Sequence, residues 1–342
     1  MKDLFKINLR QFDSLTVINK TTSNTTGNDL SSEMKTFYEK TLLEAATPHL
    51  VHQQFGKKVS IPSRSGRTVE FRKFDSLKKA LTPLTEGVTP DGDKLNVTPV
   101  IATCSQYGNY VTCSDLLELE AIDPIIAETT KKIGENAALT LDTIVRNELQ
   151  TGLNVMYAAN SQGVVPSSRS DITSDNKLTA KMVLKATTKM RKNNVPTING
   201  DYICILHPSV EEDIMSDDKW IEVQKYTNDN VTKVYKGEIG RLYNMRFVRT
   251  TEAKIYQAGT ELAPNAVYGC LILGEDGYGV VDVAGGIEVI VKQKGSGGSS
   301  DPLNQRSTIG WKINGFTAKI LQEERVLRLE CGSSYSAEDE AN

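Results

Sequence analysis

Alternating apolar and polar residues between positions 64 and 115 form the clearest strand pattern in the chain. Within Thr68–Phe74, apolar Val69 and Phe71 alternate with polar Glu70 and Arg72, which is the period of a β-strand. The return segment, 97–111, is rich in Val, Ile, Thr and Tyr, and Pro99 restricts it to a sheet edge or a bulge. A two-stranded arm of this length is not stable alone in water, so the pattern predicts an arm that lies on another surface.

Apolar residues with helical spacing occur in three other segments. Within residues 31–47, the positions that would form one helix face recur every three or four residues, and the pattern stops before Pro48. The strongest helix is predicted over 123–151, because Asp and Pro suit its first positions and Gly152 suits its end. It would be about 40 Å long, which suits a central spine. A further helix is predicted over 180–193.

Short apolar runs in the second half of the chain predict strands. The run 202–206 is apolar throughout, as in a strand buried on both faces. Further strands are expected at 245–248, 266–273, 279–283 paired with 287–293 across Gly285, 311–321 and 324–330, with residues 220–230 irregular. Helices among many strands, without regular βαβ alternation, predict an α+β fold.

Composition narrows the functional classes. The chain has 342 residues and a net charge of -3, which argues against a dedicated nucleic-acid binder. Its five cysteines are scattered without a CxxC pair, so reduced thiols are expected and no disulfide framework is predicted. Charged residues interrupt the N-terminal segment, and no run is long and apolar enough for a membrane span. These features predict synthesis and folding in the cytoplasm.

No residue pattern predicts catalysis or cofactor binding. His49 and His52 are three residues apart, but no third ligand follows at a metalloprotease spacing, so exposed polar residues are expected there. His207 ends a predicted strand and is interpreted as structural. The segment 294–300 lacks the Gly-Lys-Ser/Thr ending of a phosphate loop, and Asp91–Asp93 fits a turn better than a calcium loop. We therefore predict no catalytic, metal or cofactor site, and no enzyme.

Charged residues follow the predicted arm. Basic residues gather on its outgoing half, and acidic residues gather at its tip. A solvated face is the plainer interpretation; the functional interpretation is an arm that docks by complementary charge on neighbouring copies. The residues predicted to form salt bridges between subunits are Arg67, Arg72, Lys73 and Glu86.

Four segments, taken in order, resemble the major capsid proteins of tailed bacteriophages, which have the Hong Kong 97 phage capsid fold, and specifically the N-four-type branch. They are Gly66–Arg72 with Pro83–Pro90, Gln106–Tyr110 with Ser114–Asp115, Gly237–Gly240 with Met245–Val248, and Asp301–Arg306 with Gly310–Lys312. They span roughly residues 35 to 330.

The resemblance implies a division of the chain. The expected parts are an N-terminal arm (1–30), a peripheral domain (31–63 and 116–198) with its spine helix (123–151), an extended β-hairpin loop across the adjacent subunit (64–115), an axial domain (199–283), return strands of the peripheral domain (284–332) and a flexible tail (333–342).

The resemblance also implies pentamers and hexamers that form an icosahedral shell around double-stranded DNA in the virion. Implied partners are other copies, a portal protein, a separate scaffolding protein and a decoration protein, with DNA packaged without sequence-specific binding and no membrane. Some relatives join Lys to Asn covalently; Lys78, Lys79 and Lys94 are possible donors, but no motif identifies an acceptor. The alternatives are an encapsulin-like nanocompartment shell of the same fold, and an enzyme whose site the sequence does not reveal.

Overall fold

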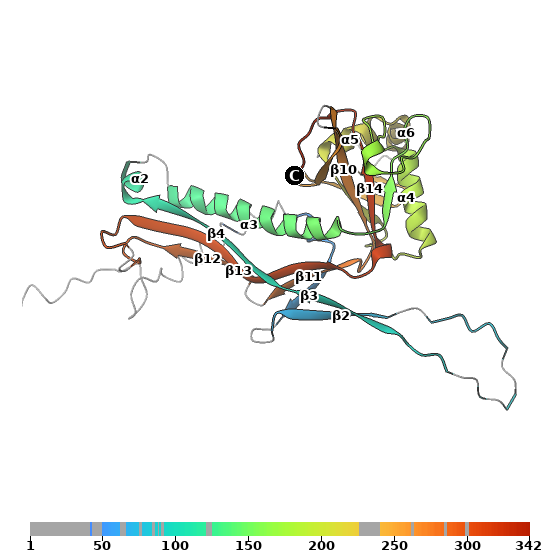
Figure 1. Cartoon of the computed structure of the whole chain (residues 1–342), viewed down its shortest axis with the longest axis horizontal. Coiled ribbons are helices and arrows are strands. Elements are labelled where there is room, and N and C mark those ends of the chain that lie inside the picture. The colour runs from blue at the N-terminus through green and yellow to red at the C-terminus, as the bar shows by residue number, and fades with distance from the viewer. Residues whose placement is uncertain are drawn as a thin grey trace, which may run out of the picture.

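The computed structural model describes residues 42, 50–61, 66–74, 77–83, 86–87, 89, 92–120, 125–225, 240–260, 263–283, 286–297 and 301–342. The expected N-terminal arm lies outside these residues, as does the helix predicted over 31–47 except for Leu42, which is helical. An elongated unit built on the longest helix meets a second, more compact unit at one end of that helix (Figure 1).

The strands in chain order are β1 (Lys57–Ile61), β2 (Thr68–Phe74), β3 (Val97–Thr103), β4 (Ser105–Ser114), β5 (Val155–Tyr157), β6 (Tyr202–Leu206), β7 (Arg241–Leu242), β8 (Met245–Arg249), β9 (Lys254–Thr260), β10 (Ala263–Leu273), β11 (Tyr278–Val283), β12 (Ile287–Lys292), β13 (Arg306–Ile320) and β14 (Val326–Cys331). The helices are α2 (Asp115–Glu120), α3 (Ile125–Leu149), α4 (Ala180–Lys192), α5 (Pro208–Met215) and α6 (Asp218–Lys225), with short 3-10 turns η3 (Arg169–Asp171) and η6 (Glu323–Arg325).

Strand β13 organises the five-stranded sheet of the elongated unit. On one edge it pairs with β4, and on the other edge it pairs first with β12 and then with β11, with β1 outside β11. The expectation that 279–283 and 287–293 pair with each other across Gly285 is therefore wrong. Because β13 has 15 residues, both short strands find their partners along its length.

Helix α3 lies along this sheet (Figure 1) and forms its core. Its described extent, Ile125–Leu149, confirms the long helix predicted over 123–151, and residues 121–124 lie outside the described part. Ile133, Ala137, Leu141 and Val145 are buried against Ile309, Trp311 and Ile313 of β13 and their neighbours. We call α3 with the five-stranded sheet the spine unit.

The seven-stranded sheet has the order β5-β14-β10-β6-β8-β7, with β9 on β10. One face of this sheet packs against α4, α5 and α6, and the other face contributes to the same core as α3. Because both faces are covered, every residue of β6 is buried, as predicted. We call this sheet with α4 to α6 the seven-stranded unit. The expectation of irregular structure over 220–230 is wrong for its first part, because α6 extends to Lys225 and anchors Trp220 in the core.

The chain crosses between the two units more often than the expected division allows. Strand β11, expected in the 199–283 domain, belongs to the five-stranded sheet. Strand β14, expected among the return strands 284–332, belongs to the seven-stranded sheet, and α4, expected in 116–198, packs on that sheet too. Apolar runs predict strands but carry no information about which sheet each strand joins.

The predicted arm over 64–115 is shorter than expected. Strands β2 and β3 pair as an antiparallel hairpin from Thr68–Thr103 to Phe74–Val97, but β4 leaves the hairpin and pairs with β13. The break falls at buried Cys104, whose N–H donates to the Arg67 carbonyl. The same alternation suits both partners, so the sequence pattern did not separate them.

The C-terminal segment 333–342, expected to be a flexible tail, is hydrogen-bonded to the seven-stranded unit. The Ser334 hydroxyl donates to Asp213, and the Tyr268 hydroxyl donates to Asp339 at 2.6 Å. Burial and this carboxylate raise the pKa of Tyr268 to about 12, so the phenol keeps the proton that it donates. Asn342 bonds to the backbone at Ile255. The segment 333–342 is attached through polar groups, and a polar composition alone predicts a solvated segment.

Side chains cap the starts of two short helices. The Ser114 hydroxyl accepts the N–H of Leu117 in α2. The His207 ring nitrogen caps α5 by accepting the Ser209 N–H, which gives His207 the structural role predicted for it.

Replacing Gly134 of α3 by Ala is expected to destabilise the protein. A Cβ there would lie 2.7 Å from the Leu42 carbonyl oxygen, so the backbone around the fully buried Leu42 must move away. The lost burial, about 1.5–3 kcal/mol, exceeds the helix-propensity gain of about 1 kcal/mol. Denaturant titration measures the change. Gly92→Ala, which meets nothing within 4 Å, is the matched control. A stabilised Gly134→Ala protein would show that the contact is not tight.

Candidate assembly surfaces

The contacts of the β2–β3 hairpin with the rest of the described chain lie at its root. Phe71 packs so closely on β11 that a Cβ at Gly279 would lie 2.6 Å from its ring, and Val69 and Ala102 complete a small core there. Beyond Phe74 and Val97 every described residue is exposed and the hairpin runs away from both units (Figure 1). Its exposed apolar side chains are Phe74, Leu77, Leu81, Leu95, Val97 and Ile101. This hairpin therefore offers apolar surface that no described residue of its own chain covers.

The predicted interface residues lie apart on this hairpin. Arg67 is exposed just before β2, and the exposed Arg72 contacts Glu70 at 3.4 Å. Lys73 points to the opposite face of the strand because side chains alternate. Glu86 is exposed at the tip. The structure does not gather these four residues into one site, and their role between subunits stays a prediction.

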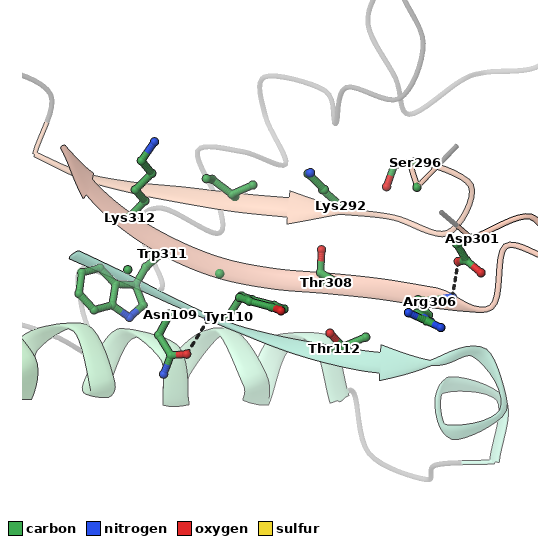
Figure 2. A pocket seen from close by; sticks show the side chains of 14 residues that line it. Asn109, Tyr110, Thr112, Lys292, Ser296, Asp301, Arg306, Thr308, Trp311 and Lys312 are labelled. Carbon is green, nitrogen blue, oxygen red and sulfur yellow. Dashed lines mark hydrogen bonds between the residues drawn. The ribbon is translucent and has the colours of Figure 1, made fainter. Parts of the chain in front are cut away.

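A groove of about 530 Å³ lies on the open face of the sheet, opposite α3. Its floor comes from β4, β13 and β12, and Figure 2 shows Tyr110, Thr308, Lys292 and Lys312 around it. Trp311 points the other way, where its indole N–H donates to Asn136 of α3. The open face is therefore hollow and is not covered by any residue that the structure describes, while the opposite face is filled by the helix.

Two glycines keep the groove shallow and open. Gly310 pairs directly with Tyr110, and a Cβ on Gly310 would lie 2.8 Å from the Tyr110 Cβ. A Cβ on Gly108 would lie 2.8 Å from the Trp311 carbonyl oxygen. Glycine inside a strand often marks close approach of another group. This was the one signal in the sequence that pointed to the groove, which sequence analysis did not identify as a site.

The groove carries positive charge. Lys292, Arg306 and Lys312 line it. The one carboxylate in the lining, Asp301, is buried and already accepts the backbone N–H groups of Gln305 and Arg306 at 3.2 and 2.9 Å. The groove thus combines an exposed aromatic ring with three basic side chains, of which Lys312 has Glu288 as its cross-strand neighbour. This combination suits a ligand that is both apolar and acidic.

A third exposed surface, the leucine tip, lies at the end of the spine unit far from the hairpin (Figure 1). Three leucines of helix α2, Leu116, Leu117 and Leu119, are 58%, 48% and 82% exposed. The exposed Leu303 lies in the turn before β13. The Asp115 N–H at the start of α2 donates to the Gln305 carbonyl of this turn, so the turn and α2 lie at the same end of the spine unit. These leucines form an apolar patch without a partner in the described part of the chain.

Among the described residues, no group of His, Cys, Asp and Glu side chains could hold a metal ion. His49 lies outside them. His52, expected to be exposed, is instead buried, and its ring nitrogen Nδ1 lies 2.6 Å from Asp142 of α3. The pair fixes the segment before β1 to the helix. Cys104 and Cys113 are buried packing residues.

Comparison with known proteins identifies the family. The sequence profile of the family described as phage capsid protein matches residues 98–328, more than half of the chain. A search of curated proteins finds no match.

Solved capsid structures share the fold at low sequence identity. The capsid of Ralstonia phage GP4 is 13% identical with a TM-score of 0.64, covering 84% of this chain and 90% of that chain. The capsid of cyanophage P-SCSP1u is 14% identical with a TM-score of 0.62, covering 83% and 89%. A virus-like particle from Pyrococcus furiosus is 10% identical with a TM-score of 0.50, covering 87% and 99%. These similarities confirm the expected Hong Kong 97 phage capsid fold.

The matched residues run from the return strand of the hairpin, through the spine helix and both sheets, to the start of β14. This chain belongs to the phage capsid protein family, as its resemblance to tailed-bacteriophage major capsid proteins predicted.

Proposed function

We propose that this chain is the major capsid protein of a tailed phage and assembles as pentamers and hexamers into an icosahedral shell around double-stranded DNA. The family match over residues 98–328 carries the proposal. The described residues leave three surfaces uncovered, namely the hairpin, the groove and the leucine tip, and this gives the valency that a closed shell needs. Its place is the virion capsid, and its synthesis takes place in the bacterial cytoplasm. No enzymatic role is part of this proposal.

Within this shell, the hairpin tip of one copy occupies the groove of the next. The tip carries Glu86 and Asp93 among exposed leucines, and the groove carries Lys292, Arg306 and Lys312 beside Tyr110. Their charges are complementary, which favours this pairing over a tip-to-tip contact. Arg67, Arg72 and Lys73 would then contact the neighbouring copy at the root of the hairpin.

Reversing the charge at Glu86 is expected to reduce assembly. Glu86→Lys would bring like charges together in the groove and lower the particle yield, measured by gradient sedimentation and electron microscopy. Glu324→Lys, at an exposed carboxylate on η6, is the matched control and should assemble normally.

A second substitution makes the Glu86 test specific. Combining Glu86→Lys with Lys292→Glu restores opposite charges, so the double variant should recover particles that each single variant loses. Unchanged assembly of Glu86→Lys would end the assigned role of Glu86, and absence of recovery would remove Lys292 as its partner.

An encapsulin-like nanocompartment of the same fold is the second candidate function, motivated by the fold shared with the Pyrococcus furiosus particle. The contents of purified particles separate the two functions. Copurifying DNA, or empty shells that accept DNA, supports the capsid, whereas one stoichiometric cargo protein supports the nanocompartment. The portal, the separate scaffolding protein and the decoration protein remain proposed partners. No described helix is long and apolar enough to cross a membrane, and no membrane partner is proposed.

A further inference from the structure

The solvent side of α4 is charged in one sign only. From residue 176 to residue 200 the chain has six Lys or Arg residues and no Asp or Glu, although its overall charge is -3. The buried side of α4 consists of Ala180, Met182, Val183, Ala186, Thr187 and Met190. Lys181, Lys185 and Lys192 lie opposite, and all three are exposed. Lys189 is turned inward and donates to the Val155 carbonyl.

Forces within the helix explain only part of this charge. Cations in the last turn, such as Lys192, are favoured by the helix dipole. Lys181 sits in the first turn, where a cation is disfavoured and where no acidic residue is present. Lys181 with Lys185, and Lys185 with Lys189, are like charges four residues apart, which is also unfavourable. An anion from outside the chain would relieve these costs.

Further lysines converge at the same end of α4. Lys177 and Lys219 join Lys181 and Lys185 around a hollow of about 530 Å³ beside residues 159–163. We call Lys177, Lys181, Lys185, Lys192 and Lys219 the lysine face. Lys181, Lys185 and Lys219 form no ion pair with any residue that the structure describes, and Lys177 lies 4.0 Å from Asp213.

The carboxylates of this hollow are already used by the protein itself. Asp175 accepts hydrogen bonds from the backbone and hydroxyl of Ser161. Asp217 accepts the N–H groups of Ala180 and Lys219, both at 2.9 Å. Both acids are held by internal donors, and the four lysines of the hollow outnumber these two carboxylates, so the lysine face keeps a net positive charge.

We propose that the lysine face binds the phosphate backbone of double-stranded DNA, an inference that rests on the proposed shell around DNA. Lys181 and Lys185 are separated by about 6 Å along the helix, and a DNA strand carries one charge per about 3.4 Å, so each lysine reaches a different phosphate. None of the described residues that line the hollow is aromatic, which disfavours stacking with single-stranded bases. Lysines act as point charges on phosphate and read no sequence, as packaging requires.

The test measures binding of a short random-sequence duplex to the full-length protein by fluorescence anisotropy, between about 50 and 200 mM salt. The variant Lys181→Gln/Lys185→Gln/Lys219→Gln removes three phosphate contacts. Since each contact contributes about 0.9 to the slope of log affinity against log salt, the slope should fall by about 2 to 3, and affinity at low salt should fall tenfold or more.

A control with the same change in net charge isolates the site. Lys57→Gln/Lys58→Gln/Lys132→Gln removes three exposed lysines from β1 and α3 and should keep the wild-type slope within about one contact. Thermal melts of both triple variants verify the fold. Equal loss in both variants, or a wild-type protein that binds no DNA or binds only single strands, would overturn the inference. Electron microscopy keeps the two claims apart: shells with unchanged DNA affinity refute this inference alone, whereas absence of shells refutes the proposed function.

Discussion

Removing the hairpin tip is expected to abolish assembly and leave the fold intact. Phe74 and Val97 are directly paired, so residues 75–96 can be replaced by Asn-Gly, which closes antiparallel strands as a two-residue turn. The root survives because Phe71 still packs on Gly279. We expect a folded protein with a wild-type melting temperature that forms no particles, measured by sedimentation velocity and electron microscopy.

Two features of the tip can be separated in the same experiment. A full-length variant with Leu77, Leu81 and Leu95 changed to Ser keeps the reach of the hairpin but removes apolar contact. It should assemble weakly, whereas the shortened hairpin should not assemble at all. Normal shells from the shortened protein would show that the hairpin is dispensable and that other surfaces carry assembly.

Replacing Glu330 by Ala is expected to cause the largest loss of stability. Its carboxylate is fully buried on β14. Arg169 contacts both its oxygens, at 2.5 and 2.8 Å, and Arg328 Nε lies 2.8 Å away as an ion pair without hydrogen-bond geometry. The Arg169 guanidinium also lies 3.5 Å from the ring centre of Tyr256. Loss of the carboxylate leaves cations in a low-dielectric site, which costs about 3–5 kcal/mol.

The effect of Glu330→Ala should be measured by denaturant titration in the shortened-hairpin protein, where assembly does not add apparent stability. Glu128→Ala, which removes an exposed ion pair with Lys131, should cost about 0–1 kcal/mol and is the control. Glu330→Gln should fall between them because its amide keeps one hydrogen bond. A change below about 1 kcal/mol in Glu330→Ala would show that the network is not a structural joint.

The Glu330 network matters because it joins the two units. Arg328 also donates to the Gln150 carbonyl, just after the end of the spine helix. The Gln150 side chain bonds the Gly269 carbonyl and the Tyr256 hydroxyl, both at 2.9 Å. Spine helix and seven-stranded sheet are thus linked by hydrogen bonds, and the loss of Glu330 should loosen the joint.

Elements with strong local signals were predictable from the sequence. The spine-helix segment has Asp123 and Pro124 in the sequence before it, Gly152 after it and a long apolar face, and the described helix Ile125–Leu149 lies within the predicted range. The apolar run of β6 identified a strand buried on both faces. In these cases the pattern depends on the segment alone, so no knowledge of partners was needed.

Partners of strands and positions of polar groups were not predictable in the same way. The alternation of β4 fits pairing with β2 or with β13, and only the tertiary fold selects β13. The pairing of His52 with Asp142 joins residues 90 positions apart, and the attachment of the C-terminal segment depends on hydroxyl groups that composition marks as solvated. The groove depends on Gly310 and Tyr110, which are 200 residues apart and meet only across the sheet.

Electron microscopy of the purified wild-type protein, alone and with any scaffolding protein encoded beside it, tests whether the chain forms a shell. We expect closed shells or capsomer rings in which the hairpin of one copy crosses the neighbouring copy. A monodisperse monomer under both conditions would contradict the proposed shell and leave the hairpin, the groove and the leucine tip without an assigned partner.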